Sequence, residues 1–176
     1  KAGMESDTKA KVTQLLTAFY FRQNGKDFGG EKTFEFTHKS FGEYLTAKRV
    51  IREIRLISKK LEEHDLDPDE GWDEREALHK WIITCGPTAL DTYILKFIVN
   101  ELKQLFTTSP LIVKNWQINL ARLLSNIFKN GAPLERLSPR PTYEIEKTLS
   151  RNAEEGLLVV LNACARATNE NSELKF

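Results

Sequence analysis

The hydrophobic pattern of this chain changes period close to its N-terminus, and this change constrains the fold more than any other feature. Phe34, Phe36 and His38 recur at every second residue, so in an extended chain they point to one face. Phe41 and Tyr44 then recur at helical spacing. The sequence therefore predicts a strand that delivers one histidine to the start of a helix.

The residues that follow His38 have the pattern of a helix N-terminus. Ser40 and Glu43 have the capping-box spacing, in which a hydroxyl and a carboxylate each satisfy a free backbone N–H. Helix N-termini favour phosphate, because several N–H groups point outward there. Since Glu43 already supplies negative charge, we expect a phosphate to be held mainly by His38, with Lys39 as a possible second contact.

The motif Phe-x-Phe-x-His-Lys-Ser-Phe-x-Glu-Tyr resembles the segment that ends the winged-helix domain of NACHT-type STAND NTPases, which include the NOD-like receptors. The resemblance is specific over about residues 34 to 47 and extends less specifically over residues 12 to 60. It implies that His38 contacts the terminal phosphate of bound ADP and helps to hold a resting, closed state. Gly42 departs from the pattern, since the family often has glutamine there.

The same resemblance implies the wider setting of the chain. A helical domain and a sensor region would follow the winged helix, and ADP or ATP with magnesium would bind to an NTPase domain of the same protein. The expected partners are that NTPase domain, the sensor region and further copies of the protein, and the expected location is the cytoplasm. Exchange of ADP for ATP would weaken the contact at His38 and permit oligomerisation.

The chain itself has no motif for nucleotide hydrolysis. A G-x-x-x-x-G-K-[ST] loop is absent, and the one Gly-Lys pair, Gly25-Lys26, is followed by Asp27. We therefore expect a non-catalytic fragment of a larger ATPase, cut within or just after its nucleotide-binding module. Its role would be to couple nucleotide state to a sensor or effector.

The predicted fold is mainly α, with an N-terminal β-hairpin, a long helix and a helical bundle. The hairpin, interpreted as the winged-helix wing, pairs residues 15–22 with residues 33–37 across a glycine-containing loop. The domains are predicted as the C-terminal part of a winged helix (1–47), a connecting helix (48–61), an acidic linker (62–71) and a helical bundle (72–176). We expect Phe34, Phe36, Phe41 and Tyr44 to have structural roles.

Breaker residues divide the rest of the chain into helices. The long helix is predicted from Ser40 to about Leu61. The bundle helices are predicted at residues 72–84, 88–106, 110–129 and 142–168, with aromatic residues at apolar positions of the bundle core. The core aromatics are Trp81, Tyr93, Phe97 and Trp116.

Four cations follow the apolar start of the long helix along one side. They are Lys48, Arg52, Arg55 and Lys59. Such a stripe suits a solvated face or pairing with the acidic linker, and less well a nucleic-acid contact. A nucleic-acid-binding winged helix with a helical dimerisation domain is the alternative function, although the net charge of +1 provides no field that attracts nucleic acid or membrane. A small helical hydrolase is a third possibility, without a local motif to support it.

Other residues that could form sites have a structural interpretation. His64 and His79 have no partner at metal-ligand spacing. Asp65, Asp67 and Asp69 resemble part of a calcium loop, but Pro68 interrupts it. The two cysteines, Cys85 and Cys164, lie among apolar neighbours, which predicts buried thiols rather than a disulfide. No apolar run approaches the length of a membrane span.

Overall fold

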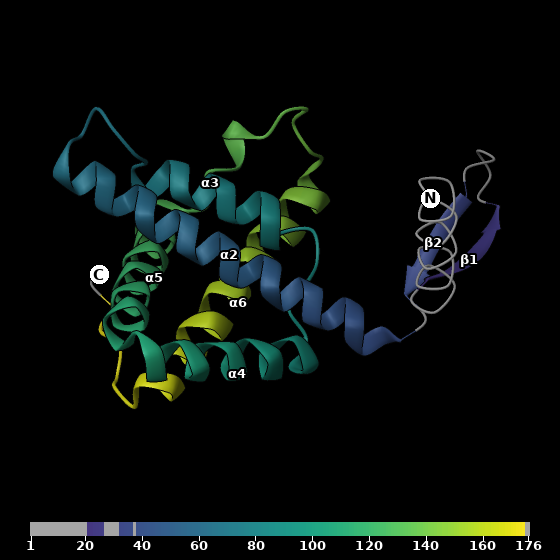
Figure 1. The fold of residues 1–176 in the computed structure, drawn as a ribbon. Coiled ribbons are helices and arrows are strands. Elements are labelled where there is room, and N and C mark those ends of the chain that lie inside the picture. Colours follow the sequence, from purple (N-terminus) through teal and green to yellow (C-terminus); the bar gives the residue numbers. More distant parts are fainter. Residues whose placement is uncertain (1–20, 27–31, 37, 175–176) are drawn as a thin grey trace, which may run out of the picture. The chain divides into compact units, whose positions relative to one another are not determined.

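The computed structural model describes residues 21–26, 32–36 and 38–174, and most of them are helical. The elements are β1 (Phe21–Lys26), β2 (Lys32–Phe36), α2 (Lys39–Leu66), α3 (Glu74–Cys85), α4 (Thr92–Thr108), α5 (Pro110–Asn130), the short 3₁₀ helix η1 (Leu134–Arg136) and α6 (Tyr143–Thr168) (Figure 1). The mainly α fold class is therefore confirmed. The chain divides into two compact units, Lys1–Leu45 and Thr46–Phe176, which are described separately below.

In the first unit, β1 and β2 form an antiparallel pair. Phe21 pairs with Phe36 and Gln23 with Phe34, and the register is irregular between Gln23 and Lys26. Strand β1 continues to Lys26, although the glycine pattern predicted a loop from residue 23. Gly25 lies at the register irregularity, where a glycine is compatible with a strand. The start of the predicted first strand, residues 15–20, lies outside the described residues.

The second unit is a helical bundle around one apolar core. Each of its long helices contributes buried side chains to this core: α2 contributes Ala47, Val50, Ile51, Ile54, Ile57 and Leu61, and α3 contributes Ala77, Leu78, Trp81, Ile82 and Cys85. Helix α6 packs against α3, α4 and α5. In the view of Figure 1, α3 runs along the top of the bundle and α6 passes behind α2. The predicted bundle helices are therefore present.

Trp81 lies at the centre of the bundle and fixes α3 against α6. Its ring is fully buried, and its indole Nε1 donates to the Ala153 carbonyl at 2.9 Å. A Cβ on Gly156 would lie 3.3 Å from the same ring, so glycine at this position permits the close approach of the two helices. The indole N–H is thus satisfied inside an otherwise apolar core, as a buried tryptophan requires.

Two helix boundaries differ from the prediction because aspartates cap later than the apolar pattern suggests. Helix α4 begins at Thr92 rather than Thr88, since the Asp91 carboxylate accepts from the N–H groups of Tyr93 and Ile94 at 2.9 Å each. Helix α3 begins at Glu74, after its own cap Asp73. The predicted proline start of α5 and the predicted end of α6 at Thr168 are confirmed.

One aromatic residue that the helical pattern assigned to the core is exposed. Tyr93 is 56% exposed and lies in the first turn of α4. Trp81 and Trp116 are buried as predicted, and Phe97 is partly buried.

Candidate functional site

His38 is exposed and immediately precedes the first residue of α2. Its main chain is held there, because the Phe41 N–H donates to the His38 carbonyl at 3.0 Å. The imidazole is therefore accessible beside the N-terminal turn of a long helix. Such a position suits a hydrogen bond to an anion, because the helix dipole adds to the attraction.

Two aromatic rings support this junction. The rings of Phe36, in β2, and Phe41, in α2, are 5.2 Å apart with an edge-to-face angle of 72°. A Cβ on Gly42 would lie 3.2 Å from the Phe36 ring, so the glycine leaves space for this ring. Gly42 is also the residue at which the chain departs from the motif described above. Tyr44 is half-buried, and the Phe34 side chain lies outside the described residues.

The predicted capping box is replaced by an ion pair. Helix α2 begins at Lys39, which places Ser40 inside the first turn instead of at the cap. The Glu43 carboxylate lies 3.4 Å from the Lys39 Nζ, and the Glu43 side chain is only 10% exposed. Because Lys39 already interacts with Glu43, His38 is the more available of the two predicted phosphate contacts.

The four cations of the predicted basic stripe differ in what they contact. Lys48 donates to Glu101 of α4 at 2.9 Å, and the Arg55 guanidinium lies 5.9 Å from the centre of the Trp116 ring. Lys59 pairs with Glu63 one turn later at 3.5 Å. Arg52 is exposed and has no ion pair within the described part of the chain. Two of the four cations therefore stabilise the bundle, which makes the stripe a poor nucleic-acid surface.

The predicted acidic linker is a closed corner. Helix α2 continues past the predicted end near Leu61 to Leu66, and the chain then folds back so that the Trp72 N–H donates to the Lys60 carbonyl at 3.0 Å. Gly71 makes this turn with φ of 74°, and a Cβ there would lie 2.3 Å from the Lys60 carbonyl oxygen. A glycine in an acidic run is the sequence signal for this turn.

Arg122 of α5 holds the corner from the other side. Its guanidinium donates to both carboxylate oxygens of Asp65, at 2.9 and 2.7 Å, and to Glu74 at 2.6 Å. Hydrogen bonds to Asp65 and then to Glu74 hold the pKa of Arg122 above its ordinary value. One side chain thus joins the end of α2 to the start of α3, a role that the sequence could not indicate because its partners are about fifty residues away in the chain.

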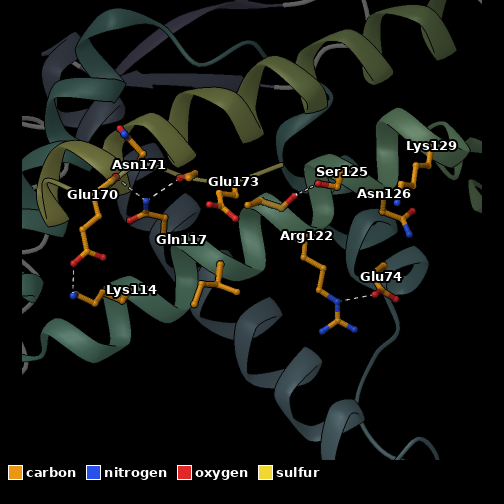
Figure 2. Close-up of a pocket in the computed structure, with 13 residues that line it drawn as sticks. Glu74, Lys114, Gln117, Arg122, Ser125, Asn126, Lys129, Glu170, Asn171 and Glu173 are labelled. Atoms are coloured by element: carbon orange, nitrogen blue, oxygen red, sulfur yellow. Dashed lines mark hydrogen bonds and ion pairs between the residues drawn. The ribbon is translucent and has the colours of Figure 1, made fainter. Parts of the chain in front are cut away.

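A cleft of about 630 Å³ lies along α5 beside the chain that follows α6 (Figure 2). We call residues 170–174 the C-terminal strap. Gln117 holds the strap: its Nε2 donates to the Glu170 carbonyl at 3.0 Å and to Ser172 Oγ at 2.8 Å, while its Oε1 accepts from Thr168 at 2.7 Å. Lys114 pairs with Glu170 at the end of the cleft.

The cleft is lined largely by polar and charged side chains. Its charged residues are mainly paired with each other, as Figure 2 shows for Lys114 with Glu170 and Arg122 with Glu74. Ser125 donates to the Ala121 carbonyl of its own helix at 2.8 Å. The cleft is therefore best understood as the space between a helix and the strap that crosses it.

Both cysteine thiols are shielded from solvent. Burial raises the pKa of Cys85 and of Cys164 to about 12, so both thiols are protonated and unreactive at neutral pH. They are free and buried, as predicted. Within residues 21–26, 32–36 and 38–174, no three histidine, cysteine or acidic side chains come together as metal ligands.

No protein-family profile, curated protein or solved structure matches this chain. Among the described residues, no helix combines the length and the apolar character needed to cross a membrane.

Proposed function

We propose that this chain is a non-catalytic regulatory region of a NACHT-type signalling ATPase, in which His38 responds to the bound nucleotide and α2 passes the response to the helical bundle. The observation that carries the proposal is the continuity of α2. This helix begins directly after the exposed His38 and reaches Leu66, and from Ala47 onward it contributes buried side chains to the bundle core. In this interpretation β1 and β2 are the wing of a winged helix.

The residues at the junction are suited to one phosphate contact and not to a complete nucleotide site. His38 offers an imidazole, Lys39 an exposed ammonium group that is shared with Glu43, and the first turn of α2 its free N–H groups. The adenine, the ribose, the other phosphates and magnesium would have to be bound by an NTPase domain of the same protein. The nucleotide would then hold the two parts together in the ADP state and release them in the ATP state.

A ligand shifts such an equilibrium only when it binds the two states differently. The test is therefore the release rate of fluorescent ADP from the longer protein in which this chain follows an NTPase domain. In the His38→Ala variant we expect ADP to dissociate several-fold faster and basal oligomerisation to increase. The control is His64→Ala, because His64 lies near the other end of the same helix and contacts the Glu70 carbonyl at 3.3 Å. Equal ADP release from the wild type and the His38 variant would refute the proposal.

The nucleic-acid alternative has less support from the structure. Lys48 and Arg55 contact Glu101 and Trp116 at the surface of the bundle, so two of the four cations in the stripe on which that function depends are already engaged. An electrostatic nucleic-acid surface needs several cations available to the phosphates at once.

A further inference from the structure

The outer face of α2 in the second unit is basic and partly apolar. Arg49, Arg52, Leu56 and Lys59 are separated by three or four residues, so they form one ridge along the helix. All four are exposed, and Leu56 is 40% exposed in the middle of the ridge. We call these four residues the basic ridge. It differs from the predicted stripe, because Lys48 and Arg55 point towards α4 and α5.

The corner after α2 has the opposite charge and its own exposed apolar side chain. Asp67, Asp69 and Glu70 are exposed, and none of them has an ion pair within the described residues. Leu66, directly before them, is 89% exposed, which is the largest exposure among the large apolar side chains of the described chain. We call Leu66, Asp67, Asp69 and Glu70 the acidic corner. The fold-back at Gly71 keeps the corner compact.

We propose that the basic ridge binds the acidic corner of a second copy of this chain, in a two-fold pair with the two α2 helices antiparallel. The ridge carries three cations and one leucine, and the corner carries three acids and one leucine. Arg49 and Lys59 are shared with Glu53 and Glu63 of the same helix, so Arg52 is the main cation that the ridge offers to a partner. The proposal deepens the self-association in the proposed function and rests on it, but it requires no nucleotide.

The antiparallel arrangement follows from the order of the charges along the chain. Two ridges placed directly against each other would bring like charges together, which opposes association. From Arg52 to Leu66 the helix rises about 20 Å. An antiparallel neighbour whose two-fold axis passes near residue 60 brings Arg52 and Leu56 of each copy towards the other copy's corner, with Lys59 close to the axis, so the same contact forms twice. One contact made by a few exposed side chains is weak. Forming it twice doubles the area buried between the two copies, and a specific pair requires such an increase.

Sedimentation velocity of the whole 176-residue chain tests the proposal. At 50 mM salt and protein concentrations of about 0.01–1 mM, we expect a reversible monomer–dimer equilibrium that stops at the dimer. Because exposed charges are screened at higher ionic strength, association should weaken more than tenfold at 0.5 M salt. A chain that stays monomeric over this range, or that grows beyond the dimer, overturns the two-fold pair.

Charge reversal identifies the surfaces. The ridge variant carries Arg52→Glu and Lys59→Glu. It keeps Arg49 because the buried Glu53 carboxylate pairs with that residue at 3.6 Å. Lys59 also pairs with Glu63, but Glu63 retains Lys60 as a partner at 2.5 Å when Lys59 is reversed. The corner variant carries Asp69→Lys and Glu70→Lys, and it keeps Asp67 because its carboxylate accepts the Asp69 N–H at 3.1 Å. We expect each variant alone to lose at least tenfold in dimer affinity, since like charges then meet.

Mixing the two variants should restore dimers, because the acidic ridge of one then faces the basic corner of the other, and the remaining contact is native. A control variant with Lys147→Glu and Arg166→Glu makes the same charge change on α6, where both side chains are exposed and have no ion pair in the described chain. It should dimerise like the wild type. Loss in only one of the two reversed variants, or a mixture that stays monomeric while both variants remain helical by circular dichroism, overturns the proposal.

Discussion

At the scale of single residues, the backbone of the α2–α3 corner depends on one glycine. Gly71 has a backbone φ of 74°, a value that residues other than glycine rarely adopt. Its missing Cβ also leaves room for the Lys60 carbonyl and the His64 N–H. The corner is further held by Arg122, whose partners Asp65 and Glu74 lie on either side of it. A region that the composition presents as an acidic linker is therefore a defined turn.

We predict that Gly71→Ala destabilises the chain more than Gly131→Ala. Both glycines have positive φ, at 74° and 71°, but a Cβ at Gly71 would lie 2.3 Å from the Lys60 carbonyl oxygen, whereas a Cβ at Gly131 has no atom within 4 Å. The Gly131 variant should cost only its backbone strain, about 1–3 kcal/mol. The Gly71 variant should cost at least about 1 kcal/mol more, because the corner must shift. Urea unfolding monitored by circular dichroism measures both, and equal losses would show that the corner yields freely.

At the scale of elements, sequence patterns located the helices well and their ends less well. The Ser109-Pro110 and Asn130-Gly131 signals placed α5 correctly, because proline and glycine constrain the backbone directly. Composition misled at residues 62–66, which continue α2, since Asn115 and Arg122 of α5 provide partners for Glu62 and Asp65. Those partners come from tertiary packing, which local composition does not encode.

Some features of the candidate site were also predictable from the sequence, and others were not. The position of His38 just before a long helix was predicted from the change in period and the capping pattern, whereas its exposure was not predicted from the pattern. The clamp made by Arg122 and the strap held by Gln117 did not, because each joins residues that are about fifty positions apart. The basic stripe was predicted as four equivalent cations, but its members differ in the structure according to which of them face α4 and α5.

The C-terminal strap depends on the amide of Gln117, which is only 5% exposed. We predict that Gln117→Leu releases the strap, because the Glu170 carbonyl, Ser172 and Thr168 lose their shared partner. Leaving buried polar groups unpaired costs about 1–3 kcal/mol. A glutamate-specific protease should then cut after Glu170 or Glu173 several-fold faster, as identified by mass spectrometry. Gln104→Leu on the exposed face of α4 is the control, and an unchanged cutting rate in the Gln117 variant would contradict the role of the amide.

At the scale of the whole molecule, the bundle core belongs to one unit. Among the described residues, the buried apolar cluster begins at Ala47, and the unit boundary falls between Leu45 and Thr46. The proposed regulatory role uses this division, because it assigns the nucleotide contact to the first unit and the receiving core to the second. Because the described core residues all lie in the second unit, the bundle should not need the hairpin in order to fold.

We predict that a fragment spanning residues 46–176 unfolds cooperatively, with a Tm within a few degrees of that of the whole chain. The reason is that it retains the entire apolar cluster, whose burial is the main source of stability. A second fragment that starts at Ser58 is the matched comparison. It lacks Ala47, Val50, Ile51, Ile54 and Ile57, and removing large core side chains costs about 2–5 kcal/mol each. Thermal unfolding followed by circular dichroism should therefore show a cooperative transition for the first fragment and none for the second. If the first fragment also fails to unfold cooperatively, the hairpin unit contributes to the stability of the bundle. The regulatory proposal, in which α2 carries the response to an independently stable core, would then be contradicted.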